Sequence, residues 1–145
     1  AVLEYLVGDY GMTWLFVITK EDAKSTLRLD AFPLDDTKEK VPGFQAVEKF
    51  RKSLQSGDLG FVEVSKDLYR RLVSPAERLL NGKSKLIIIP DASLWDVPFQ
   101  ALIDGGGKYL VERIGVSYAP SLSILGEMWK LKREANGVGE RSILA

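Results

Sequence analysis

The first 33 residues have the hydrophobic spacing of β-strands. Leu3, Tyr5 and Val7 alternate with Glu4, Leu6 and Gly8, and residues 13–19 form an aromatic and β-branched run. A third alternating run ends at Pro33, and short polar links join the three. Residues 1–33 are therefore predicted to form an antiparallel β-meander whose second strand is the middle or the most covered one.

Between residues 42 and 82 the spacing becomes helical. Apolar residues recur every three or four positions from Phe44 to Leu54, and Gly57 ends this stripe. We expect Ser65 to cap a second helix, in which Leu68, Leu72 and Val73 face inward.

The segment Ser74-Pro75-Ala76-Glu77 matches a capping box with proline at the first helical position. It predicts that the helix breaks at Ser74, restarts under a cap formed with Glu77, and ends at Asn81-Gly82.

The most informative run is Lys85-Leu86-Ile87-Ile88-Ile89-Pro90-Asp91. Four consecutive branched residues without a polar break predict a strand covered on both faces, as in the centre of a parallel sheet. Pro90 cannot donate to the ladder and ends the pairing. Asp91 is thus expected at the carboxyl end of the strand, where open α/β sheets place their ligands.

The residues after Asp91 are predicted to pack against this strand. Trp95, Phe99 and Leu102 are expected to share one face of a short helix, followed by a flexible tip of three glycines and an extended segment from Lys108 to Arg113. A second core strand is expected at residues 114–118. Ser121 should cap a helix that carries Leu122, Leu125, Met128 and Trp129, and the core region closes at residue 131. Residues 134–145 are expected to form a polar linker and then the opening of another strand.

Composition excludes several classes of function. The chain has 145 residues, zero net charge, no His and no Cys. With no net charge, the chain has no overall electrostatic attraction for nucleic acid, and it has no apolar run long enough to span a membrane. Without His and Cys it cannot form a Cys–His dyad, a Ser–His–Asp triad or a usual zinc site. We expect a cytoplasmic protein without a cofactor, a metal or a catalytic residue of its own.

Asp91 and Asp96 are the best candidates for acid–base or Mg²⁺ chemistry, because both lie on one loop after a core strand. The alternative is structural: Asp91 caps the turn, and Asp96 caps the helix before Pro98. We favour the structural interpretation because no third ligand is evident. A small metal-dependent hydrolase is the least favoured function.

Other polar and aromatic clusters have structural explanations. The glycines before Lys108 fit neither a phosphate loop nor a dinucleotide fingerprint and suggest a hairpin tip. The cations Lys130, Lys132 and Arg133 are typical of a last helical turn. The aromatic residues occur at core-facing spacing and are expected in the core: Trp14, Phe16, Phe44, Phe50, Trp95 and Phe99.

One stretch of the sequence closely resembles the CHAT domain, a caspase-like, separase-related domain found with tetratricopeptide repeats. The resemblance rests on Pro-Asp at 90–91, Pro-Phe-Gln-Ala-Leu at 98–102, Tyr-Leu-Val-Glu at 109–112 and Ser-Tyr-Ala-Pro-Ser at 117–121. The motif positions singled out are Pro90, Asp91, Asp96, Pro98, Phe99, Tyr118, Pro120 and Ser121. One departure is Ala92, which replaces the glycine usual after Pro-Asp and should alter that turn.

The resemblance implies an α/β fold in which the N-terminal meander precedes the helices and core strands of a caspase-like three-layer α/β/α sheet. It implies a cysteine peptidase, or a degenerate relative, whose His and Cys follow later strands. Residues 1–145 are then one partial domain cut from a longer protein, inactive alone, whose main partner is the downstream catalytic half of the same chain. The alternative is a non-enzymatic interaction module of a tetratricopeptide-repeat protein. Protein partners and a homodimer through residues 114–118 or 121–131 are expected; nucleic acid and membrane are not.

Overall fold

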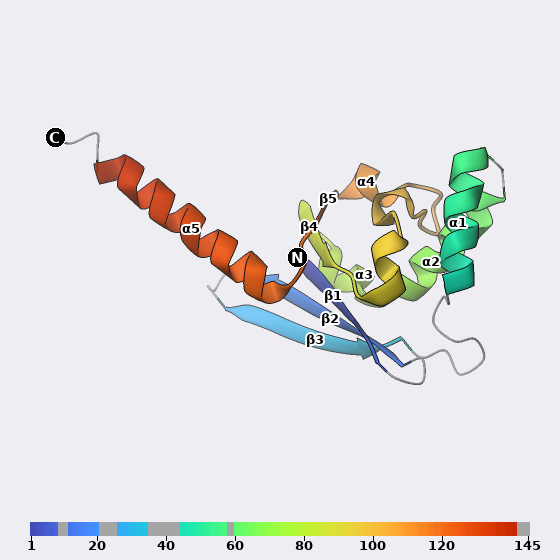
Figure 1. The fold of residues 1–145 in the computed structure, drawn as a ribbon, viewed down its shortest axis with the longest axis horizontal. Helices are drawn as coiled ribbons and strands as arrows, with labels where there is room; N and C mark the ends of the chain where they lie inside the picture. Colours follow the sequence, from blue (N-terminus) through green and yellow to red (C-terminus); the bar gives the residue numbers. More distant parts are fainter. Residues whose placement is uncertain (9–11, 21–25, 35–43, 58–59, 142–145) are drawn as a thin grey trace.

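The structure, a computed structural model, describes residues 1–8, 12–20, 26–34, 44–57 and 60–141, with the backbone alone at 44–46 and 136–141. Five strands form one mixed sheet, in the spatial order β3 (Leu27–Pro33), β2 (Thr13–Lys20), β1 (Val2–Val7), β4 (Lys85–Ile89) and β5 (Gly115–Tyr118). Helices pack on this sheet (Figure 1), so the predicted α/β class is confirmed.

The first three strands form the predicted antiparallel meander. Tyr5 of β1 lies opposite Leu15 of β2, and Val17 is also fully buried on the same face. Trp14 and Phe16 point to the other face, where their rings stack with centroids 6.5 Å apart. β2 lies between β1 and β3 and is apolar on both faces, as its sequence predicts.

Strand β4 lies in the interior of the sheet and runs parallel to both β1 and β5. Leu86 and Ile88 are 0% exposed on one face, and Ile89 is 3% exposed on the other. Pro90 is buried directly after the strand. The prediction of a covered central strand is therefore confirmed. Neither face of β4 is open to water, which explains why its sequence has no alternating polar residues.

Three helices cover the face of the sheet that carries Leu3, Tyr5 and Ile88. They are α1 (Phe44–Ser56), α2 (Phe61–Leu72) and α3 (Glu77–Leu80). Gly57 follows α1 at φ +66° and Gly82 follows α3 at φ +75°, in the left-handed region that glycine adopts without strain. Both predicted helix ends are correct.

Two serines predicted to cap helices do not. Ser65 lies inside α2 and is fully buried. Ser74 begins a 3₁₀ turn, η2 (Ser74–Ala76), in which the N–H of Glu77 donates to the Ser74 carbonyl oxygen instead of the hydroxyl. The predicted break at Ser74 is correct, but the cap is wrong because the tight turn supplies a main-chain acceptor.

The connection from β4 to β5 contains two 3₁₀ helices instead of the single helix predicted. They are η3 (Ala92–Asp96) and η4 (Phe99–Ala101), separated by extended backbone at Val97. Phe99 and Leu102 are fully buried, whereas Trp95 is 50% exposed and not a core residue. The prediction failed because a 3₁₀ turn has three residues per turn, and the interruption at Val97 changes which side chains share a face.

The glycine tip is a tight hairpin turn, as predicted. Gly107 has φ +82°, and an antiparallel bridge joins Ile103 to Tyr109. The predicted extended segment after it is wrong, because α4 (Leu110–Arg113) is a single helical turn. It begins where the Glu112 carboxylate accepts the N–H of Tyr109 at 2.6 Å, and it buries Leu110.

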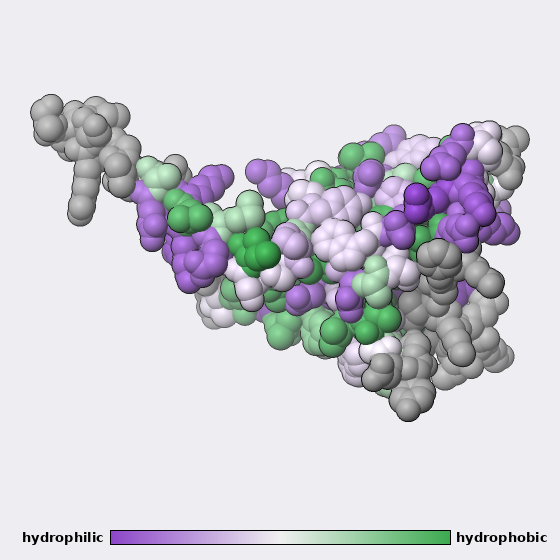
Figure 2. All heavy atoms as spheres, viewed as in Figure 1, coloured by the Kyte–Doolittle hydropathy of each residue, from purple (hydrophilic) through white to green (hydrophobic). Residues whose placement is uncertain are grey.

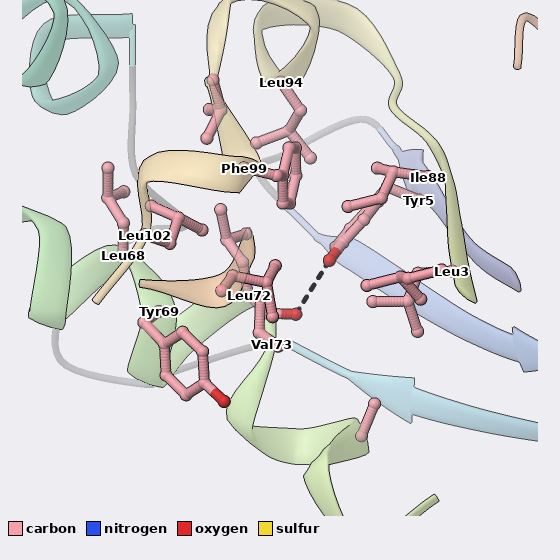
Figure 3. Packing of buried hydrophobic residues seen from close by; sticks show 14 of the residues in the cluster. Leu3, Tyr5, Leu68, Tyr69, Leu72, Val73, Ile88, Leu94, Phe99 and Leu102 are labelled. Atoms are coloured by element: carbon pink, nitrogen blue, oxygen red, sulfur yellow. Dashed lines mark hydrogen bonds between the residues drawn. The ribbon is translucent and has the colours of Figure 1, made fainter. Parts of the chain in front are cut away.

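The main hydrophobic core lies between the sheet and these helices. Leu3, Tyr5 and Ile88 from the strands meet Leu72 of α2 and Phe99 of η4 (Figure 3). The Tyr5 hydroxyl donates to the carbonyl oxygen of Leu72 at 2.9 Å and so ties β1 to the end of α2. Burial raises the pKa of the Tyr5 phenol, which keeps it a neutral donor.

A smaller cluster lies on the other face, under the first turns of α5 (Leu122–Arg141). Val2, Ile89, Ala119 and Leu125 are buried there. Beyond these turns α5 projects away from the body (Figure 1). The predicted linker at Glu134–Arg141 is wrong because the helix continues through it. Residues such as Lys132, Arg133, Glu134 and Ala135 are good helix formers, although none of them packs in a core. The strand predicted from residue 142 lies outside the described residues.

The length of α5 does not make it a transmembrane segment. It has 20 residues but carries charged side chains throughout. Within the described ranges, no helix has both the length and the apolar character needed to cross a membrane.

Candidate functional site

The candidate site begins at Asp91, at the carboxyl end of β4. One carboxylate oxygen accepts the N–H of Ala92 at 2.9 Å, and the other accepts the N–H of Val7 at 2.9 Å. Val7 is the last residue of β1, so this carboxylate joins the carboxyl ends of two parallel strands and caps η3. The structural interpretation of Asp91 accounts for these contacts.

Ala92 occupies a backbone position suited to glycine. Its φ is +46°, the one positive value among the described non-glycine residues. A side chain in this left-handed region crowds its own carbonyl group, which stores strain in the turn. The Asp91 carboxylate holds the Ala92 N–H in place, so the turn keeps a glycine-like geometry despite the methyl group.

Asp96 has a different partner and does not form a pair with Asp91. Its Oδ1 lies 3.1 Å from Nη1 of Arg51 on α1, with both side chains about half exposed. It ends η3, and Pro98, not Asp96, holds the position before η4, so its predicted helix cap is wrong. The described residues contain no group of three or more His, Cys, Asp or Glu that could hold a metal ion. Nothing in this geometry favours the metal-dependent hydrolase.

The Pro98-Phe99 motif packs an aromatic ring between two strands. The Phe99 ring lies 5.4 Å from the ring of Tyr5 and 6.4 Å from that of Tyr118, centroid to centroid. The N–H of Phe99 donates to the Tyr118 hydroxyl at 3.0 Å, and that hydroxyl donates to Oε1 of Gln100 at 2.7 Å. Tyr118 thus bonds β5 to η4, and burial raises the pKa of its phenol.

Ser65 makes the corresponding connection from α2. Its Oγ donates to the Ala101 carbonyl oxygen at 2.8 Å and accepts the N–H of Ile103 at 2.9 Å. One buried hydroxyl therefore satisfies two main-chain groups, one at the end of the Pro-Phe-Gln-Ala-Leu segment and one directly after it. Sequence reasoning missed this role, since the partners lie 36 and 38 residues away.

A second polar cluster surrounds Arg113 of α4. Its Nη1 lies 2.9 Å from Oε1 of Glu77, 3.0 Å from Oδ2 of Asp104 and 2.9 Å from the Tyr69 hydroxyl. Asp104 also accepts the N–H groups of Gly106 and Lys108, at 2.8 and 3.0 Å, which shapes the glycine turn. Apart from the neighbouring Tyr-Leu-Val-Glu motif, no sequence pattern predicts this four-residue network.

The pKa shifts in the Arg113 cluster move away from neutrality. Burial alone would raise the pKa of Asp104, but the N–H groups of Lys108 and Gly106 and the Arg113 guanidinium outweigh it, so this pKa lies below its usual value. Burial raises the pKa of Tyr69 to about 12, against the opposing effect of Arg113. These shifts keep Asp104 charged and Tyr69 neutral, and together with the hydrogen bonds they indicate a structural cluster.

The last two motif residues begin α5. The Ser121 hydroxyl accepts the N–H of Ile124 at 3.2 Å, which confirms the predicted cap. Pro120 is exposed just before it. In the basic cluster farther along, Lys130 pairs with Glu127 at 2.6 Å, while Lys132 and Arg133 are exposed.

Comparison with known proteins identifies the family. The sequence pattern of the CHAT domain matches residues 62–140, which run from α2 to α5 and include every motif residue described above. No curated protein matched the chain. Since the match covers more than half of the chain, the protein belongs to the CHAT domain family.

Proposed function

We propose that this chain is the N-terminal, structural portion of a caspase-like cysteine peptidase domain and does not hydrolyse peptides alone. The supporting observation is that several motif residues hold main chain or pack against the core. Asp91 joins two strand ends, Phe99 fills the space between Tyr5 and Tyr118, and Ser121 caps α5. The chain also has no His and no Cys to supply a dyad.

In this proposal the chain contributes one wall of the substrate groove. Strands β1, β4 and β5 are parallel, so their carboxyl ends meet at one edge of the sheet, where α/β proteins bind ligands. Asp91 and Tyr118 lie at that edge, where hydrogen bonds join Asp91 to η3 and Tyr118 to η4. A rigid edge of this kind positions groups supplied by later strands. The catalytic His and Cys then come from the downstream half of the same polypeptide.

Thiol mapping in the full-length product of the gene tests this proposal. We expect an alkylating peptide probe to label one cysteine outside residues 1–145. Replacing Asp91 with alanine should slow that labelling, because the strand ends it joins would loosen. A matched surface change, Glu48→Ala, removes a carboxylate that pairs with Lys52 on the surface of α1 and should leave labelling unchanged. A full-length product without a reactive thiol would contradict the proposal.

A non-enzymatic interaction module of a tetratricopeptide-repeat protein is the second candidate. It is favoured by the apolar side chains left exposed on α5, among them Met128 and Trp129 at 57% and 48%. Binding of a partner by the full-length product, with no peptide turnover and no reactive thiol, would select this function over the first.

A further inference from the structure

The sheet face opposite α1–α3 is apolar and only partly covered. We call its uncovered part the open strip, which consists of Leu6 of β1, Trp14 and Phe16 of β2, and Leu27 and Leu29 of β3. Leu6, Leu27 and Leu29 are 52%, 65% and 64% exposed. In Figure 2 apolar side chains gather along the lower margin of the body, where Figure 1 shows β3. A contiguous apolar surface of this kind marks an interaction site.

A single acidic group lies inside the open strip. Glu4 is the cross-strand neighbour of Phe16 on β2 and of Ile89 on β4, so it shares their face. It is half-buried, and burial raises its pKa. No described residue forms an ion pair or hydrogen bond with its carboxylate. A partner that covers the strip must therefore bring a cation to this carboxylate or leave it buried and unpaired, which is costly.

A hollow of about 370 Å³ adjoins the open strip, between α5 and the amino ends of β1 and β4. Its lining includes Leu27 of the strip together with Ile18, Ile87, Leu122 and Trp129. The hollow offers room for apolar side chains of a partner at the end of the strip.

The same chain carries a helix of complementary character. On α5, Ile124, Met128 and Leu131 follow the i, i+4, i+7 spacing of one helical stripe and are 47%, 57% and 65% exposed. At 100° per residue this stripe lies about 120° around the helix from Leu122 and Leu125, which cover the chain's own sheet. Lys132 borders the exposed stripe and has no ion-pair partner among the described residues.

We propose that the open strip binds α5 of a second copy of this chain, so that the stripe Ile124, Met128 and Leu131 covers the strip and Lys132 pairs with Glu4. The occupant is a second copy because the helix supplies both features that the strip requires, an apolar stripe and an adjacent cation. In a two-fold symmetric dimer this contact forms twice, because the open strip of each copy binds α5 of the other. This inference does not depend on peptidase activity.

Sedimentation velocity across a concentration series tests the contact. We expect wild-type chain to dimerise, and Leu29→Lys on the strip or Met128→Glu on the helix to weaken the dimer about tenfold or more. The matched control is Val111→Lys, which changes an apolar side chain of similar exposure, 54%, on α4 and should leave the dimer unchanged. Thermal melts should show that all three variants remain folded, because the altered side chains are exposed.

Charge exchange identifies the orientation. Glu4→Lys and Lys132→Glu should each weaken the dimer, and the double variant should restore it, because the ion pair is re-formed with reversed signs. Mixing Leu29→Lys with Met128→Glu should recover partial dimerisation, because one of the two strip–helix contacts is then intact. A chain that stays monomeric at every concentration, or a dimer indifferent to these changes, overturns the proposal.

Discussion

Replacing Ser65 with alanine tests the connection between α2 and the Pro-Phe-Gln-Ala-Leu segment. The substitution removes one oxygen that is fully buried and satisfies two main-chain groups, the Ala101 carbonyl and the Ile103 N–H. Each neutral hydrogen bond contributes about 1 kcal/mol, and a buried N–H left without a partner costs about 1–3 kcal/mol. We expect Ser65→Ala to lower the free energy of unfolding by about 2–3 kcal/mol.

Urea denaturation measures this loss, and the chain offers a matched control. With a slope of about 2 kcal/mol per molar urea, the midpoint should fall by about 1–1.5 M. Ser53 is also buried, at 8% exposure, but its hydroxyl donates only to the Lys49 carbonyl one turn back in α1. Ser53→Ala should cost about 0.5 kcal/mol or less, because that carbonyl keeps its helical partner. Equal midpoints for the two variants would refute the role assigned to Ser65.

Three further changes test other parts of the fold. Ile88→Asp should leave the chain insoluble or unfolded, because it puts an unpaired charge at a fully buried position of β4; a soluble variant with a native melting curve would count against this. Ala92→Gly should raise the free energy of unfolding by about 0.5–1 kcal/mol in urea titrations, because relief of the left-handed strain exceeds the added chain entropy; a destabilised variant would show that the turn is not strained. The pKa of Asp104 is lowered in the folded state, so its contribution to stability is present above about pH 4 and is lost as the pH falls through the folded value. The free energy of unfolding should therefore fall less steeply with acid for Asp104→Asn than for wild type. Identical pH profiles would contradict the lowered pKa.

The parts of the fold that could be predicted are those whose cause is local in the sequence. Four branched residues before Pro90 indicate a strand covered on both faces, because a strand with one face in water would alternate apolar and polar residues. Gly57 and Gly82 identify helix ends, because few other residues adopt their positive φ. Asp91 was recognised as a cap, because its partner Ala92 is the next residue.

The parts that were missed depend on residues distant in the sequence or on a change of helix type. Ser65 looks like a cap by residue type, but its position in the fold gives it two partners in another segment. Arg113 gathers acidic groups from α3 and the glycine turn, which no spacing rule brings together. An α-helical spacing predicts that Trp95 faces the core, but η3 is a 3₁₀ helix and leaves this side chain exposed.

Peptide hydrolysis by a homogeneous preparation of residues 1–145 distinguishes a structural role of this chain from a catalytic one. The chain and its Asp91→Ala variant are incubated with a mixed peptide library, and cleavage is read by mass spectrometry beside the full-length product of the gene. We expect no cleavage by either short chain, and cleavage by the full-length product that iodoacetamide abolishes. Turnover by residues 1–145 that disappears in the Asp91→Ala variant would contradict it and assign the chemistry to the carboxylate at the end of β4.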